Sequence, residues 1–101
     1  MEGKPRARRD ALWVASWAQG SDTVALALAS NAVISLCQVL RPRSLLDEWW
    51  VRTLHRDDGR LLWEERLPGE PETGGLLVDR DGRIVVALED GRIVAYGISR
   101  I

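Results

Sequence analysis

Short apolar runs separated by turn residues dominate the second half of the chain. Asp-Gly pairs at 58–59, 81–82 and 90–91 punctuate them. Asp-Gly between alternating apolar residues is a strong hairpin signal, because a tight turn needs positive φ at its centre, which glycine and aspartate tolerate. Proline 68 and proline 71 interrupt the pattern, since proline removes a ladder donor and fixes φ. The sequence therefore predicts antiparallel strands near residues 60–67, 75–79, 83–89 and 92–98.

The run at 83–89 is apolar on both of its faces. Ile84, Val86 and Leu88 share one face of a strand, while Val85 and Ala87 lie on the other. A strand that is apolar on both faces is typical of a sheet covered on both sides. We therefore expect this sheet to be packed between neighbours, with neither face in water.

Residues 23–40 carry no charge and follow a basic arm, as a membrane anchor does. Ser30, Asn31, Ser35 and Gln38 interrupt the run, which is too short and too polar for a spanning helix of about 20 residues. Two buried strands separated by a Ser-Asn turn explain the same residues. We expect no membrane insertion.

An internal repeat relates the two halves of the chain. Trp13 and Trp63 lie 50 residues apart, and aligning them also superposes Leu12 on Leu62. The alignment continues for Thr23 with Thr73 and Leu26 with Leu76; a gap brings residues 33–34 over 84–85, and 51–54 over 93–96. Four strands per unit, repeated twice, is the pattern of propeller blades. The predicted fold is all-β, with two antiparallel four-stranded propeller-type blades.

The predicted organisation has three parts. A flexible basic arm spans residues 1–10, blade-like repeat 1 spans 11–58 with an insertion at 39–50, and blade-like repeat 2 spans 59–101. In the insertion, Ser44 followed by Asp47 and Glu48 resembles a capped helix start, which predicts a short helix. Leu46, Trp49 and Trp50 on it are candidates for a partner-binding surface, because tryptophans are common interface anchors. The alternative is a helix folded back over its own blade.

Composition and charge narrow the possible functions. The chain has 101 residues, 46% hydrophobic and 29% charged, which is typical of one ordinary globular domain. Its net charge of −1 gives no field that would attract nucleic acid or an anionic membrane. Cys37 is the single cysteine, so an internal disulfide is excluded. A lone thiol and the lack of a signal-peptide pattern slightly favour the cytoplasm.

No group of residues in the sequence suits catalysis or metal binding. His55 is the single histidine and lies beside an Asp-Asp turn, where a surface role is expected. Asp79 and Asp81 resemble the start of a calcium loop, but Arg83 occupies the next ligand position, so a hairpin turn is favoured. Glu64 and Glu65 point to opposite faces of a strand. We expect no enzyme activity, cofactor or metal.

Residues 54–64, with their aspartate-rich turn, Gly59 and a tryptophan four positions later, resemble the repeat of quinoprotein-type (pyrroloquinoline-quinone-like) propellers. The similarity continues through 74–87 and 90–96, and the best match is 54–98. The first copy keeps Trp13 but has Arg9 in place of the glycine. In that family the tryptophan docks between adjacent blades, so the resemblance implies this role for Trp13 and Trp63. Core filling is the alternative for either tryptophan.

Glycines would serve such a blade as structural residues. Gly74 and Gly75 are followed by no lysine and no helix start, so they do not form a phosphate loop. On an innermost strand, glycine lets backbones crowd the axis. Gly59 belongs to the turn that precedes the docking tryptophan.

Two blades are fewer than the four to eight from which propellers are built. An open blade face of about 400 Å² would gain roughly 10 kcal/mol on being covered, before association costs. We therefore expect a non-catalytic scaffold or protein-interaction module that binds copies of itself or other propeller blades, or a remnant of a longer propeller. The alternative is a fragment of a quinone- or ligand-binding propeller enzyme. Against this alternative, the sequence shows none of the clustered acidic and cationic residues that such a pocket needs.

Overall fold

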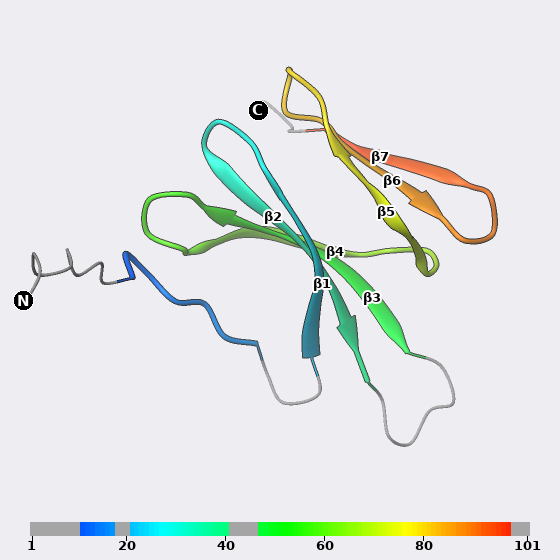
Figure 1. Cartoon of the computed structure of the whole chain (residues 1–101), viewed down its shortest axis with the longest axis horizontal. Coiled ribbons are helices and arrows are strands. Elements are labelled where there is room, and N and C mark those ends of the chain that lie inside the picture. The colour runs from blue at the N-terminus through cyan, green and yellow to red at the C-terminus, as the bar shows by residue number, and fades with distance from the viewer. Residues whose placement is uncertain (1–10, 18–20, 41–46, 98–101) are drawn as a thin grey trace, which may run out of the picture.

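Two antiparallel sheets make up the protein in the computed structural model, which describes residues 11–17, 21–40 and 47–97 (Figure 1). No helix occurs within those ranges. The first sheet has the order β1-β2-β3-β4 and the second has the order β5-β6-β7. The strands are β1 (Ser21–Leu28), β2 (Ala32–Val39), β3 (Glu48–His55), β4 (Leu61–Arg66), β5 (Pro71–Val78), β6 (Ile84–Leu88) and β7 (Ile93–Tyr96). The prediction of an all-β fold is confirmed.

The three Asp-Gly pairs form the turns β3–β4, β5–β6 and β6–β7, as predicted. Gly59, Gly82 and Gly91 have φ of 76°, 84° and 92°. In each turn an aspartate accepts a hydrogen bond from the backbone N–H of the arginine that follows the glycine, at 2.9–3.0 Å. The same arginine forms an ion pair with that aspartate. Asp-Gly-Arg is therefore a recurring turn unit of this chain.

The strand boundaries agree with the prediction in three cases and differ in the fourth. The fifth strand starts at Pro71, where 75 was predicted. Proline is tolerated as the first residue of a strand. Between Pro71 and Leu76 the pairing with β6 shifts register, and Gly74 there has a φ of 75°. This irregular stretch, typical of a β-bulge, hid the beginning of the strand in the sequence pattern.

The predicted helix is wrong for the part of the insertion that the structure describes. Glu48, Trp49 and Trp50 open β3 and pair with Val39, Gln38 and Cys37 of β2. Aromatic residues favour strands, and a continuous ladder satisfies more backbone groups than an isolated helical turn. The β2–β3 hairpin is therefore longer than the β6–β7 hairpin, its counterpart in the second repeat. Ser44, Leu46 and the rest of 41–46 lie outside the described residues, as does the predicted arm at 1–10.

Residues 23–40 form two strands, as expected. The turn between β1 and β2 contains Ser30 and Asn31, and the N–H of Ala29 donates to the carbonyl of Ala32 across it. Every residue of β2 is buried or half-buried. Within the described ranges, no helix is long and apolar enough to span a bilayer.

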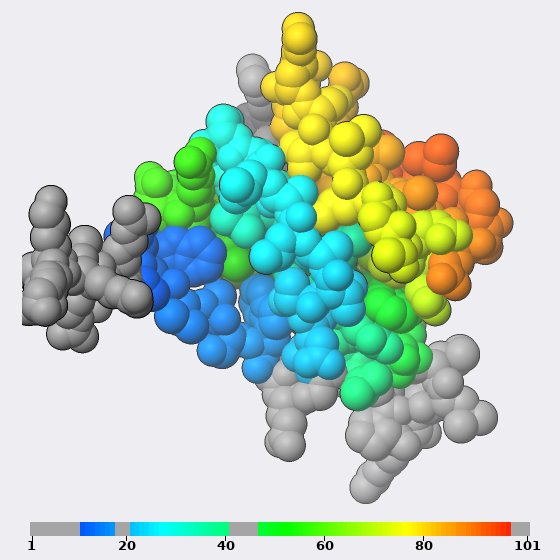
Figure 2. Space-filling model, viewed as in Figure 1, coloured from blue at the N-terminus to red at the C-terminus, as the bar shows by residue number. Residues whose placement is uncertain are grey.

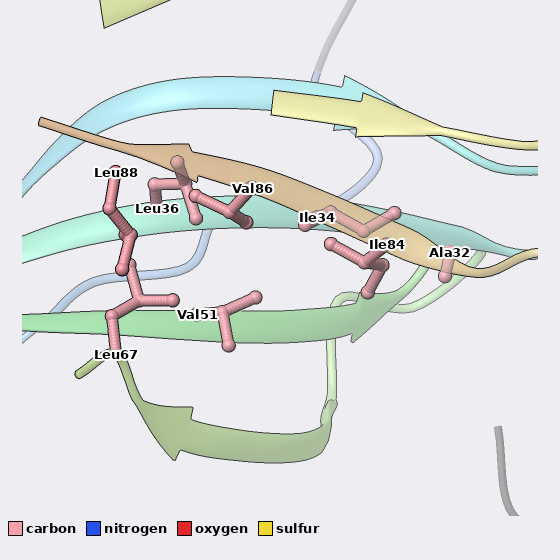
Figure 3. Close-up of a cluster of buried hydrophobic side chains, with 8 residues drawn as sticks. All are labelled: Ala32, Ile34, Leu36, Val51, Leu67, Ile84, Val86 and Leu88. Atoms are coloured by element: carbon pink, nitrogen blue, oxygen red, sulfur yellow. The ribbon is translucent and has the colours of Figure 1, made fainter. Parts of the chain in front are cut away.

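The core lies between the two sheets. Ile84, Val86 and Leu88 of β6 face Ile34 and Leu36 of β2 (Figure 3). Val51 of β3, Ala32 and Leu67 complete the cluster. All eight residues have at most 9% of their surface exposed. Ile84, Val86 and Leu88 share one face of β6, as predicted, and this face packs against β2 and β3.

The second sheet has three strands, so the prediction of two four-stranded sheets is wrong in its second half. The strand that contains Trp63, β4, pairs with β3 and completes the first sheet. Leu67 and the Pro68–Pro71 connection then carry the chain to β5. The described residues hold no fourth strand beside β7.

Leu36→Ala is expected to lower the free energy of unfolding by about 2–5 kcal/mol, because it leaves a cavity in the inter-sheet core. Leu36 is 1% exposed, whereas Leu40, just beyond β2, is 48% exposed. Leu40→Ala is the matched control and should change stability by less than about 0.5 kcal/mol. Urea denaturation followed by circular dichroism measures both. Equal losses in the two variants would contradict the core assignment.

Candidate interaction faces

Each sheet has an outer face that is directed away from the core. Partners in the first sheet place Leu26 with Ser35 and Leu28 with Val33 on this side. Partners in the second sheet place Leu77 with Val85 and Ala95, and Ala87 with Ile93. The first set together with Cys37 defines the outer face of the first sheet. The second set defines the outer face of the second sheet. The outer face of the second sheet is mainly apolar, whereas that of the first sheet mixes apolar side chains with Ser35, Arg52 and Glu64.

Large apolar side chains are exposed on both outer faces. Leu26 and Leu28 are 67% and 69% exposed, and Leu77 and Ile93 are 62% and 73% exposed. Single exposed leucines are common, whereas neighbouring exposed apolar side chains on one sheet face are candidates for an interaction surface. We expected both faces of β6 to be covered. In the described part of the chain, only the face that points to the core is covered.

Residues 11–17 cover part of the outer face of the first sheet. The indole N–H of Trp17 donates to Thr23 Oγ1 at 2.8 Å, and Thr23 Oγ1 lies 3.3 Å from Ser35 Oγ. Ser35 Oγ lies in turn 3.1 Å from Cys37 Sγ, and both residues are fully buried. This row of small polar groups is thus shielded from water and internally hydrogen-bonded.

Arg52 lies on the same face between two tryptophans. Its guanidinium is 4.6 Å from the ring centroid of Trp17 and 5.9 Å from that of Trp50. Its Nε donates to Glu64 Oε2 at 2.8 Å. Cation–π contact and a partly buried ion pair therefore fix Trp17 over the sheet. Nη1 of Arg52 is buried and finds no partner within the described ranges.

Trp13 docks on the β3–β4 turn. Its indole N–H donates to the carbonyl of Arg56 at 2.8 Å. A Cβ added to Gly59 would lie 2.5 Å from Trp13 Cε3, so the ring rests directly on the glycine backbone. Gly59 thus serves two purposes: its φ of 76° closes the turn, and its missing side chain makes room for the indole.

Trp63 contacts the second sheet. Its ring centroid is 6.0 Å from that of Tyr96 at an interplanar angle of 47°, a favourable tilted arrangement. Burial, with a smaller contribution from the charge of Glu65, raises the pKa of the Tyr96 hydroxyl. The structure therefore places each repeated tryptophan against the sheet that follows it. Trp63 also packs against the inter-sheet core, which agrees with the core-filling alternative. Docking between propeller blades stays a prediction.

The two glycines of β5 have different surroundings. A Cβ on Gly75 would lie 3.0 Å from the carbonyl oxygen of Ala87 and 3.1 Å from that of Glu72, so the glycine lets β5 and β6 approach closely. Crowding at a propeller axis stays a prediction. Gly74 has open space around it, so its φ of 75° alone accounts for the glycine.

Trp49 and Trp50 lie on opposite faces of β3, because neighbours on a strand alternate. Trp49 packs against the inter-sheet core. Trp50 lies on the outer face near Arg52, and its indole N–H donates to Glu48 Oε1 at 3.1 Å. The described residues do not combine the two rings into one surface, and Leu46 lies outside them. A partner-binding role for these residues stays a prediction.

A cleft of about 590 Å³ opens between the sheets at the end that holds the β1–β2 and β5–β6 turns. Asp79 and Asp81 at its rim form ion pairs with Arg83 and are thus occupied within the turn. His55 lies in the β3–β4 turn, where Nδ1 accepts the N–H of Asp57 at 3.2 Å. Within the described ranges, no three histidine, cysteine or acidic side chains are placed to hold a metal ion.

Residues that sequence reasoning missed complete the picture. Trp17 and Arg52 form the cover of the first outer face, and Tyr96 receives Trp63. Trp17 follows Trp13 by four positions, as Leu67 follows Trp63. Leu67 is buried in the core, and Trp17 is its counterpart in the repeat alignment. The alignment could therefore have indicated Trp17 as a packing residue. The stacking of Arg52 had none, since it depends on which side chains meet across strands.

Comparison of the chain with family models, curated proteins and solved structures found no match. The protein is therefore described by its structure: it is an all-β chain of two packed antiparallel sheets, and both outer faces expose large apolar side chains.

Gly59→Ala should destabilise the protein more than Gly91→Ala does. Both glycines have positive φ, which costs an alanine roughly 1–2 kcal/mol, but Gly91 has no atom within 4 Å of an added Cβ. The excess cost in Gly59→Ala therefore reports the Trp13 contact. In a Trp13→Ala background the excess should vanish. Chemical denaturation gives the free energy of unfolding of Gly59→Ala and Gly91→Ala, each alone and combined with Trp13→Ala. An excess cost of Gly59→Ala that persists without Trp13 would refute the contact.

Asp79→Asn should lower the melting temperature at neutral pH, with a loss that fades in acid. The backbone N–H of Arg83, assisted by its guanidinium, lowers the pKa of Asp79 below its ordinary value of 3.8. A lowered folded-state pKa contributes stability that is present above about pH 4 and is lost as pH falls through the folded value. Melting curves from pH 7 to pH 2 test this.

The control for that series is Asp57→Asn. Asp57 is exposed in the β3–β4 turn, and its carboxylate accepts no hydrogen bond from the described part of the chain. Its melting temperature should follow that of the wild type at every pH. A loss in Asp79→Asn that is independent of pH would contradict the electrostatic explanation.

Proposed function

We propose that the chain is a non-catalytic, propeller-type scaffold that assembles with copies of itself through its two outer faces. The observation that carries this proposal is that both outer faces, on opposite sides of one small protein, expose large apolar side chains. A piece of a longer propeller would offer the same faces to other blades. The resemblance of residues 54–98 to quinoprotein-type repeats supports the propeller-type reading.

Burial of these faces is the physical drive for assembly. Four large aliphatic side chains are exposed by 62–73% on them. Burying such a side chain contributes about 1.5–3 kcal/mol, so the faces together offset much of the cost of association. A chain of 101 residues has a total stability on the order of 5–15 kcal/mol, and covering its faces changes that stability substantially.

The two faces differ in residue content, which determines the geometry of assembly. The outer face of the first sheet carries Trp17 and Arg52, whereas that of the second sheet is aliphatic. Unlike surfaces associate head to tail, and such contacts form rings when the rotation closes. Two, three or four copies would supply four, six or eight sheets, the numbers from which propellers are built.

Ile93→Glu should shift the assembly toward monomer, because a carboxylate in the centre of an apolar contact must be desolvated. Ile93 is 73% exposed, so the monomer should keep its fold, as checked by circular dichroism. Leu40→Glu, at an exposed site outside both outer faces, is the matched control and should keep the wild-type mass. Native mass spectrometry and sedimentation measure the outcome. A wild type that stays a folded monomer at micromolar concentration would refute the proposal.

A further inference from the structure

Residues 11–17 hold the same position relative to the first sheet that residues 61–67 hold relative to the second. Trp13 rests on the β3–β4 turn of the first sheet, and Trp63 rests on Tyr96 of the second. Trp17 covers Arg52 on the first sheet, and Leu67 is buried against the second. Each repeated tryptophan thus contacts the sheet that follows it in the chain, although the contacted residues differ.

The two segments differ in their strand partners. Residues 61–66 form β4 and pair with β3, whereas 11–17 form no strand within the described structure. Leu12 and Val14 are 91% and 80% exposed. Conversely, β7 pairs with β6 on one edge, and no described residue pairs with its other edge. Residues 11–17 therefore have no strand partner, and the outer edge of β7 has none either within the described ranges.

We propose that residues 11–17 of one copy pair antiparallel with β7 of a second copy and complete its second sheet as a fourth strand. The pairing rests on the proposed self-association and specifies its contact. Main-chain hydrogen bonds to an open edge supply affinity, and side chains on alternate positions supply register.

The register follows from β3 and β4. There Val51 pairs with Glu65 and Thr53 pairs with Trp63. The repeat alignment places Ile93 at the position of Val51 and Ala95 at that of Thr53. Transfer of the pairing sets Ala15 opposite Ile93 and Trp13 opposite Ala95. Trp13 then lies between the outer face of the second copy's second sheet and the first sheet of its own chain.

The facing surfaces agree with this register. The alignment of 33–34 with 84–85 makes Val85 the counterpart of Ile34, so the outer face of the second sheet corresponds to the core face of the first. Inside one chain, that core face packs against the second sheet. Between chains, the outer face of the second sheet would pack in the same way against the outer face of the next copy's first sheet.

A single chain does not make this pairing with itself. Residues 11–17 and the second sheet lie on opposite sides of the first sheet (Figure 2). The core contact between β6 and the β2–β3 pair fixes that separation. A second copy is therefore the occupant that brings the unpaired segment to the open edge.

The test is a disulfide between copies. Full-length Ala15→Cys and Ile93→Cys chains are mixed, oxidised mildly and resolved by mass, with an affinity tag on one of them. Directly opposed residues on antiparallel strands have Cβ atoms about 4.5–5.5 Å apart, within reach of a disulfide after a small adjustment. The mixed 15–93 dimer should be the main product. Both sites are exposed, so the substitutions leave the fold intact.

Two controls make the result specific. In the first control, Leu77→Cys chains are mixed with Ala15→Cys chains in place of Ile93→Cys chains. Leu77 lies on the same outer face but on β5, so this mixture should give only background levels of the mixed dimer. Wild type carries Cys37, which is fully buried and should give none. Main products joined 15–15 or 93–93 would indicate a two-fold arrangement and overturn the strand pairing.

Failure of this inference is separable from failure of the proposed function. A wild type that assembles, but whose mixed variants give no 15–93 product above the Leu77→Cys background, overturns the strand pairing and leaves self-association standing. A monomeric wild type overturns both.

Discussion

Apolar contact between β6 and the β2–β3 pair is the interaction on which this structure depends. A sheet that is apolar on one face must bury that face against another layer, and each sheet here supplies the layer that the other needs. Ile34, Leu36 and Val51 on one side meet Ile84, Val86 and Leu88 on the other. The same contact sets the position of Trp63 against Tyr96 and opens the cleft between the turns. Everything else in the molecule is arranged around this layer.

Because β6 is apolar on both faces, packing one face leaves the other to be covered from outside. The first sheet has the same problem, and residues 11–17 solve it in part. Trp17 lies over Arg52 and is hydrogen-bonded to the row of Thr23, Ser35 and Cys37, but Leu26 and Leu28 of β1 stay exposed. A repeat protein with few units meets this difficulty at both ends, since each unit is stabilised by its neighbours. Under the proposed self-association, function and stability are therefore linked through the same surfaces.

Errors in the sequence-based prediction have identifiable physical causes. A serine followed by acidic residues is a valid helix start in isolation, yet Trp49 and Trp50 joined a strand because β2 offered a continuous row of partners. The fourth strand of the second unit was expected from the repeat, but the strand holding Trp63 belongs to the sheet that precedes it in the chain. In both cases the local pattern was read correctly, and the choice of partner overrode it. Long-range pairing carries no local signature.

The sequence alone determined the turns, the strand type and the two-sided character of β6. Asp-Gly pairs and alternating apolar residues act within a few positions, so these features follow from local sterics and burial. Only the tertiary structure decided that Trp13 lies on Gly59 and that Arg52 stacks between Trp17 and Trp50. It also decided that the outer edge of β7 and parts of both outer faces have no partner within the described residues. Those outcomes depend on which strands meet across the molecule. The physical reason is that burial is a property of pairs of surfaces, whereas a sequence records each surface separately.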